Sequence, residues 1–330
     1  MQAHGRTWWR RAAVVALCGA AVVHCSGAKA GNERNVRTGK ARLSADPEPQ
    51  PIPTAAQLAP AGPDAVGSGD GGVRLTGQDQ VGVTTRQVAT GKFEITANIE
   101  HDGHSATVEV LLGMAAAETT EVLAVAQGNA VKIRESIEKM RVSMQMHIEM
   151  DGQRQDKQQP SMVLPLEGQV VIGERQGDVW VRHLEAGAPT PEQAKMLDEP
   201  VPVTDMYPQE PVAVGHSWNL PSSAMRALSG GFLRDVQGHA SATLRELVPC
   251  GAHTCGVVAF SGDMAGTVAG DTGFGTVKWQ IAGECKHDLS SGADLSCQFS
   301  GPIEGQLQVG QGAQANVTGR LEFTAKESVQ

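Results

Sequence analysis

Residues 93–112 read FEITANIEHDGHSATVEVLL, and this stretch decides the fold class. Apolar and polar residues alternate on both sides of Asp102-Gly103, a dipeptide that favours a tight turn between two strands. The same alternation recurs from about residue 80 onward, with turn residues between the segments. The sequence therefore predicts a mainly β protein with few short helices, built as a large curved antiparallel sheet or a partly closed barrel.

Further strands are expected wherever the alternation returns. Their ranges are 121–126, 131–150, 168–172, 178–183, 240–248, 256–261, 276–289, 296–307 and 315–323. The segment 131–150 is ambiguous, because its isoleucines and Met140 also fit the apolar stripe of a helix. Strict alternation from Val142 to Ile148 favours a strand there.

Two short helices are expected between the strands. One begins at Pro191 after Thr190, whose hydroxyl can cap the helix, and Gln193 completes a Thr-x-x-Gln capping box. The other spans 222–228 and follows Pro221.

Composition divides the chain into three segments. Residues 1–30 have the layout of a secretory signal peptide. Residues 31–76 are rich in proline and glycine and predict a disordered tether without a core. Residues 77–330 are expected to form the β-rich domain, in which prolines near 199–211 can join two halves. Whether these halves are a duplication is left open.

The signal peptide is predicted from charge and hydrophobicity. Arginines precede an apolar run from Ala12 to Val23, which is too short to span a bilayer. Ala28-Lys29-Ala30 has the small residues at which signal peptidase cuts, so cleavage between Ala30 and Gly31 is expected. The chain is therefore expected to be exported, to the periplasm or outside the cell.

A lipid anchor is the alternative to simple secretion. Cys25 closes the apolar run and is a candidate for lipidation, which would make the chain an outer-membrane lipoprotein. His24 stands where a lipidation site has a small residue, so we expect secretion without lipidation.

Charge limits the choice of partners. Without residues 1–30 the chain keeps 23 basic and 36 acidic residues, a net charge of −13. Such a surface repels phosphate backbones, which argues against nucleic-acid binding. The partner itself stays unknown; an envelope protein or an amphiphilic ligand is the expected kind. The sequence does not specify the oligomeric state.

Four cysteines remain after the predicted cleavage, and export makes disulfides the default expectation. A turn at Ser290-Ser291-Gly292 would bring Cys285 opposite Cys297. Likewise, residues 251–254 can connect two strands so that Cys250 faces Cys255. A zinc site built from all four cysteines is the alternative, but their spacings fit it poorly.

Local motifs of catalysis are absent from the sequence. It contains no Gly-x-Ser-x-Gly, no His-Glu-x-x-His and no Walker loop. We therefore expect no enzyme activity and no cofactor. His101 and His104 flank Asp102, but so few ligands define no metal site, and we expect a solvated turn.

A resemblance can be stated for the segment 201–218. Pro211-Val212, Val214-Gly215 and Trp218 resemble the Pro-Val-x-Val-Gly-Asp-x-Trp element of uncharacterised β-rich secreted proteins and lipoproteins of Gram-negative bacteria. His216 replaces the aspartate. The resemblance implies no established activity, and structural roles suffice for both motif residues: Gly215 would allow a tight bend and Trp218 would plug the sheet.

These features lead to three hypotheses. The first is a non-catalytic exported envelope or secreted protein that acts by binding or as a structural component. The second is a periplasmic carrier of a lipid or other amphiphile, in which aliphatic strand faces enclose an apolar cavity. A hydrolase without a local motif comes third, because a Ser-His-Asp site can assemble from residues far apart in sequence.

Overall fold

The computed structural model describes residues 72–77, 79–101, 104–150, 152–198, 201–202, 206–229, 233–270, 273–309 and 313–329. The predicted signal peptide, the cleavage site at Ala30 and Gly31, Cys25 and nearly all of the predicted tether lie outside these residues. Asp102 and Gly103 of the first predicted turn also lie outside them.

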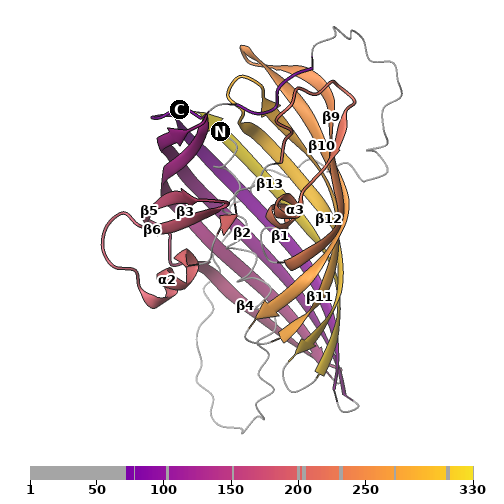
Figure 1. Cartoon of the computed structure of the whole chain (residues 1–330). Helices are drawn as coiled ribbons and strands as arrows, with labels where there is room; N and C mark the ends of the chain where they lie inside the picture. Colours follow the sequence, from indigo (N-terminus) through magenta and orange to yellow (C-terminus); the bar gives the residue numbers. More distant parts are fainter. Residues whose placement is uncertain are drawn as a thin grey trace. The chain divides into compact units, whose positions relative to one another are not determined.

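One antiparallel sheet of 13 strands makes up most of the described chain (Figure 1). The strands are β1 (Thr84–His101), β2 (His104–Ala126), β3 (Asn129–Met150), β4 (Gln153–Val163), β5 (Val170–Gln176), β6 (Val179–Leu184), β7 (Val201–Pro202), β8 (Ser217–Asn219), β9 (Arg234–Cys250), β10 (His253–Gly270), β11 (Gly273–Asp288), β12 (Asp294–Val309) and β13 (Ala313–Val329). The prediction of a mainly β fold on a large antiparallel sheet is confirmed.

The first and last strands of the sheet, β1 and β13, pair at its centre. From β1 the order runs outward through β2, β3, β5 and β6 to β7, and from β13 it runs back through β12, β11, β10 and β9 to β8. β4 pairs with β3 beside β5. The short strands β7 and β8 end this order, so the sheet is not closed into a barrel.

The ambiguous segment 131–150 lies within strand β3, as the alternation predicted. Its helix-like stripe has a local cause. The register shifts where Ala117 pairs with Lys139 and Glu118 with Ile137, so Glu138 is an extra residue in β3. Such a bulge returns Ile137 and Met140 to one face, although they are three residues apart.

Several strands are longer than predicted, and three were missed: β4 and the short edge strands β7 and β8. β2 continues through residues 113–120, where the alternation of small and polar residues gave no clear strand signal. β10 extends the predicted 256–261 to 18 residues. β4 has the polar sequence QRQDKQQPSMV. It pairs with β3 on one side, and most of its side chains are exposed, so no period of two marks it.

Both predicted helices are present, α2 (Pro191–Leu197) and α3 (Ser222–Leu228). The capping box of α2 forms as expected: the Gln193 amide donates to Thr190 Oγ1 at 3.3 Å, and the Thr190 amide donates to Gln193 Oε1 at 2.9 Å. Within the described residues, no helix has the length and hydrophobicity to span a membrane.

Candidate functional site

One face of the sheet is apolar without interruption across eight strands. Strand register aligns its residues in rows from β3 to β9. They are Met140, Val142, Met144, Met146, Ile148 and Met150 on β3; Ala106, Val108, Val110, Leu112, Met114 and Ala116 on β2; Ala89, Gly91, Phe93, Ile95, Ala97 and Ile99 on β1; Ala315, Val317, Gly319, Leu321, Phe323 and Ala325 on β13; Cys297, Phe299, Gly301, Ile303, Gly305 and Leu307 on β12; Gly275, Val277, Trp279, Ile281, Gly283 and Cys285 on β11; Val258, Phe260, Gly262, Met264, Gly266 and Val268 on β10; and Gly238, Ala240, Ala242 and Leu244 on β9. We call this set the apolar face.

Most large side chains of the apolar face are buried, Trp279, Phe260 and Leu112 almost completely. The strands also approach each other closely there. A Cβ atom on Gly301 would lie 1.6 Å from the carbonyl oxygen of Gln280 in β11, so only glycine fits. The face therefore combines bulky aliphatic and aromatic groups with positions where the backbone itself is the surface.

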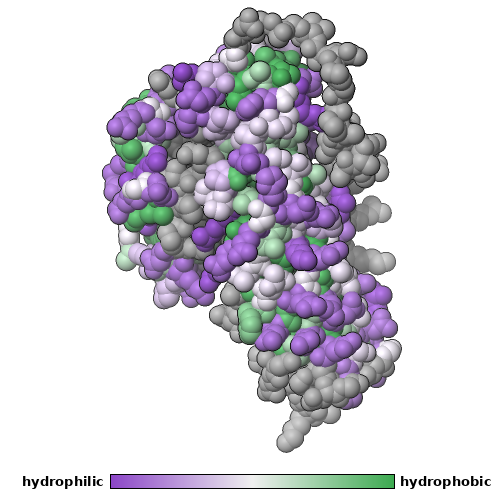
Figure 2. All heavy atoms as spheres, turned by 45° about the vertical axis from the view of Figure 1, so that its right-hand side comes forward, coloured by the Kyte–Doolittle hydropathy of each residue, from purple (hydrophilic) through white to green (hydrophobic). Residues whose placement is uncertain are grey.

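The opposite face carries charged pairs between different elements of the chain. Arg86 Nη2 lies 2.7 Å from Glu138 Oε2, and Arg141 Nη2 lies 2.8 Å from Glu167 Oε1. Hydrogen bonds from Arg86 and Thr119 hold the pKa of Glu138 below its ordinary value. Figure 2 shows one side of the molecule, on which hydrophilic residues are widespread and hydrophobic patches are smaller.

Buried polar residues begin where the apolar face ends. Beyond the row of Met140 and Ala116, the next positions on the same face of β2, β1 and β13 carry charged or polar groups, whereas β3 carries the buried Ile137. These are Glu118, Gln87 and Glu327 in one row and Glu135, Thr120 and Thr85 in the next, with Arg182 on β6 nearby; all are buried. We call these seven residues the polar belt. The sequence alone does not reveal the belt, because each of its residues by itself is an ordinary polar position in a strand.

A second buried polar cluster lies on β11 and β12 near the same end. His287 is fully buried; its Nδ1 lies 2.8 Å from Asp294 Oδ1 and its Nε2 lies 2.5 Å from the carbonyl oxygen of Leu75. The Tyr207 hydroxyl donates to the same oxygen of Asp294 at 2.5 Å. The contact between His287 and Leu75 fastens residues 72–77 to the sheet.

The two expected disulfides form, Cys250–Cys255 and Cys285–Cys297. Cys285 lies directly opposite Cys297, as the turn predicted. The other hairpin differs: Cys250 lies opposite His253, because the turn contains only Gly251 and Ala252 rather than four residues. Its disulfide is therefore diagonal across the turn.

The disulfides also argue against the alternative of a zinc site built from the four cysteines. Among the described residues, Cys285, Asp294 and Cys297 have ligand atoms within 4.8 Å of one another. Both sulfurs are bonded to each other, however, so neither is a thiolate that could bind a metal.

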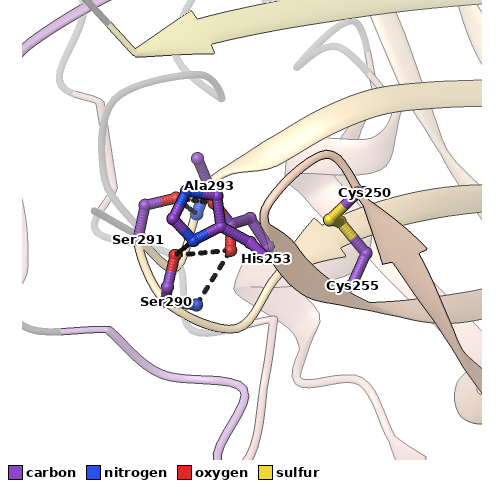
Figure 3. Close-up of a disulfide and its surroundings, with 7 residues drawn as sticks. Cys250, His253, Cys255, Ser290, Ser291 and Ala293 are labelled. Atoms are coloured by element: carbon purple, nitrogen blue, oxygen red, sulfur yellow. Dashed lines mark hydrogen bonds between the residues drawn. A yellow bond between two sulfur atoms is a disulfide. The ribbon is translucent and has the colours of Figure 1, made fainter.

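Figure 3 shows a serine and a histidine in contact beside the disulfide Cys250–Cys255. Ser290 Oγ lies 3.0 Å from His253 Nδ1 and donates to Asp288 Oδ1 at 2.8 Å. A catalytic triad needs the carboxylate on the histidine, whereas Asp288 holds the serine itself and its amide. Burial acts to raise the pKa of Asp288, and hydrogen bonds from Ser290 and Ser291 outweigh it and lower that pKa. Asp288, Ser290 and Ser291 therefore stabilise the turn between β11 and β12.

The residues of the Pro-Val-x-Val-Gly element lie at one edge of the sheet. Gly215 has φ +87°, a conformation suited to glycine, and its amide donates to the carbonyl of Leu244. Trp218 lies in the edge strand β8, opposite Ala242, and donates to the carbonyl of Met206 at 2.9 Å. It packs near Tyr207 at the edge of the sheet rather than within it.

His101 and His104, which flank the first predicted turn, are placed as follows. His104 lies opposite His101 at the ends of β1 and β2, and its side chain is exposed. Met144 and Met146 lie on the apolar face. An open hollow of about 410 Å³ also occurs by β10 to β12, lined by Asp263, Lys278 and Glu304 among others. These three charged residues are exposed, so the hollow lacks the enclosed character of a ligand site.

Comparison with known proteins assigns the chain to no family: no family model matches it, and no curated protein matches it. An outer membrane channel from Pseudomonas putida F1 is 8% identical, with 81% of this chain and 100% of that chain covered and a TM-score of 0.23. The translocator domain of the autotransporter NalP from Neisseria meningitidis is 10% identical, with coverage of 74% and 88% and a TM-score of 0.23. At these scores the likenesses establish no function.

Proposed function

We propose that the protein is an exported, non-catalytic binding protein of the cell envelope that carries an amphiphile on its apolar face. The observation behind the proposal is the continuity of that face, on which no polar side chain occurs across the rows from β3 to β9. A structural sheet needs only enough apolar surface for its own core. Such a continuous face is what the carrier hypothesis requires, and for this reason we favour it over a purely structural role.

The dimensions of the face suit an alkyl chain. From Ala89 to Ile99 it extends about 33 Å along the strand, at about 3.3 Å per residue. The acyl chains of one bilayer leaflet occupy about half of a hydrocarbon core that is about 30 Å thick. The face is thus long enough to hold such a chain along its strands.

Few other elements of the described chain can cover this face. α2 and α3 have seven residues each, which corresponds to a length of about 10 Å. Domains usually bury a sheet face against a second layer of helices or strands. Most large side chains of the face are buried without a ligand, so a bound amphiphile would have to displace the groups that now cover them.

Other features support export and a non-catalytic role. The apolar run from Ala12 to Val23 predicts secretion, and two disulfides suit an oxidising compartment. The histidine contacts with Ser290 and Asp294 serve a turn and the anchoring of residues 72–77. The negative net charge favours solubility in the envelope space.

The test is native mass spectrometry of the protein purified without detergent from the envelope of its host. We expect a bound species of lipid mass that is lost on denaturation. Masses of the denatured chain show whether cleavage occurs before Gly31 or a lipid is attached to Cys25. If no lipid is bound, the carrier proposal fails.

A matched pair of variants locates the ligand. Ala97 is half-buried on the apolar face, and its neighbour Asn98 is exposed on the opposite face. Ala97→Trp places a large ring on the apolar face, so we expect the amount of copurified lipid to fall severalfold. Asn98→Trp should leave it unchanged. Equal lipid content in both variants, with both folded by circular dichroism, would contradict binding on this face.

A further inference from the structure

The segment of residues 72–77 lies across the end of the apolar face. Near its start, Val73 forms a β-bridge with Val212, and the Val73 amide donates to the Val212 carbonyl at 2.8 Å. Further on, the carbonyl group of Leu75 contacts His287 on β11. His287 follows the last apolar-face position of that strand, so the contact marks the end of the face. We call residues 72–77 the strap.

Most contacts that hold the strap run through its backbone. Of its residues, all of which the structure describes, Leu75 alone is buried. A Cβ atom on Gly77 would lie 2.8 Å from the carbonyl oxygen of Ser291, so the two backbones touch there. One hydrogen bond contributes modestly to stability, but a segment held by so few side chains opens more readily when it loses one.

His287 attaches the strap through a ring that needs two protons. Its Nδ1 lies 2.8 Å from Asp294 Oδ1, and its Nε2 lies 2.5 Å from the carbonyl oxygen of Leu75. Both partners are acceptors, because a carbonyl carries no proton and Asp294 Oδ1 already accepts from the Tyr207 hydroxyl. Each ring nitrogen therefore donates, which requires the protonated imidazolium.

A neutral ring keeps only one of these two bonds, because it has one N–H group and one lone pair. The carboxylate is the stronger acceptor, so Asp294 retains the proton on Nδ1. The lone pair on Nε2 then faces the carbonyl oxygen of Leu75, and two acceptors in contact repel each other. Because His287 is fully buried, solvent does not relieve this repulsion. Deprotonation thus breaks the contact with the strap and leaves the contact within the sheet.

The described groups around the ring leave His287 as the one that titrates near neutral pH. β12 contributes the carboxylate of Asp294, Tyr207 contributes its phenol, and β10 presents Gly256 opposite the ring. Carboxyl groups ordinarily titrate near about pH 4 and phenols near about pH 10. The charged neighbours in sequence do not face the ring: Arg74 and Lys286 are exposed, and Asp288 accepts from Ser290 in the turn.

We propose that the strap is a pH-dependent closure over this end of the sheet, held down by protonated His287 and released when the ring loses its proton. The closed strap binds one proton more than the open strap, so falling pH favours the closed state and rising pH the open state. Opening would uncover Leu75 and the end of the apolar face. The device uses only residues of this chain, so it stands whether or not an amphiphile binds.

The test measures hydrogen exchange at the Val73 amide, which bonds to Val212 when the strap is closed. Rates for the intact exported protein are divided into the intrinsic rate at each pH, which gives a protection factor. Between about pH 5 and about pH 9, across the range in which histidine titrates, we expect this factor to fall about tenfold, the scale of one hydrogen bond. The Gly82 amide, which donates to the Val122 carbonyl at 2.9 Å outside the strap, should keep its protection.

Two histidine variants identify the group responsible. His287→Gln removes the ring that titrates, so the protection factor of Val73 should no longer depend on pH. His253→Gln is the matched control, because His253 is an exposed histidine that contacts Ser290 in the neighbouring turn. The pH response should persist in this control. Thermal melts confirm that both variants fold.

The outcomes decide the proposal without reference to a ligand. Protection of Val73 that stays constant or rises with pH in the unsubstituted protein overturns it, and this measurement needs no variant to fold. A fall that persists in His287→Gln, or one that disappears in His253→Gln, also overturns it, because another group would then control the strap. Lipid in native mass spectra tests the carrier function separately, so the two proposals fail independently.

Discussion

Leu111 and Leu112 are consecutive residues of β2 with the same side chain, yet they belong to opposite faces of the sheet. Leu112 is 1% exposed on the apolar face, whereas Leu111 is only half-buried on the face that carries the ion pairs. The two faces of the same strand therefore differ in how well they tolerate a polar side chain. On the apolar face a polar group needs a partner, and on the other face water supplies one.

The largest expected effect comes from placing a charge on each face in turn. Leu112→Asp buries a carboxylate among apolar side chains and should lower the free energy of unfolding by more than about 3 kcal/mol. Leu111→Asp should lower it by less than about 1 kcal/mol, because water solvates that face. Urea unfolding measures both. Similar losses in the two variants would show that the faces are not distinct.

The disulfides give the next largest effect. Replacing both cysteines of Cys285–Cys297 by serine should cost about 3 kcal/mol, and the same change at Cys250–Cys255 about 2 kcal/mol, because the first bond closes the longer loop. Guanidinium unfolding of the two double variants checks the order. A larger loss at Cys250–Cys255 would mean that loop length does not govern the difference.

Tyr207→Phe tests whether a buried polar group at the end of the apolar face depends on its hydrogen-bond partner for stability. The change removes the hydroxyl that donates to Asp294 and should cost about 1–2 kcal/mol, as for a hydrogen bond to a charged group. Thermal unfolding measures the loss. Trp218→Phe, which removes a neutral hydrogen bond to the carbonyl of Met206, is the comparison and should cost less.

The smallest effect is expected from the ion pairs of the solvated face, and it depends on pH. Arg86 holds the pKa of Glu138 below its ordinary value in the folded protein, so the stabilisation exists above the unfolded pKa of about 4.3 and is lost as pH falls through the folded pKa. Glu138→Gln should therefore lower the melting temperature slightly at pH 7 and not at pH 2. More than a third of each side chain is exposed, which keeps the effect small.

Glu109→Gln is the control for this pH series, because Glu109 is exposed on the same face of β2. We expect its melting temperature to follow that of the unchanged protein at both pH values. A difference for Glu138→Gln that persists at pH 2 would contradict the ion-pair explanation.

Local patterns predicted much of this fold. The period of two identified β1 and most of β3, and a turn with Gly292 placed Cys285 opposite Cys297, because these features depend on neighbours in sequence. The exposed strand β4 has no such pattern and was missed. The polar belt was missed for another reason: Glu118, Glu135 and Arg182 meet only through pairing of distant strands, and a single strand does not show which face its charges occupy.

The pairing of β1 with β13 has a consequence for the order in which the molecule is completed. Thr85 pairs with Val329, so the centre of the sheet joins the two ends of the described chain. Hairpins on either side can form from local segments, whereas this junction closes the longest loop and is expected late in folding. Both the apolar face and the polar belt cross it. We therefore expect a ligand site on this face to form only after β13 has paired with β1. A chain truncated before β13 should lack the site altogether.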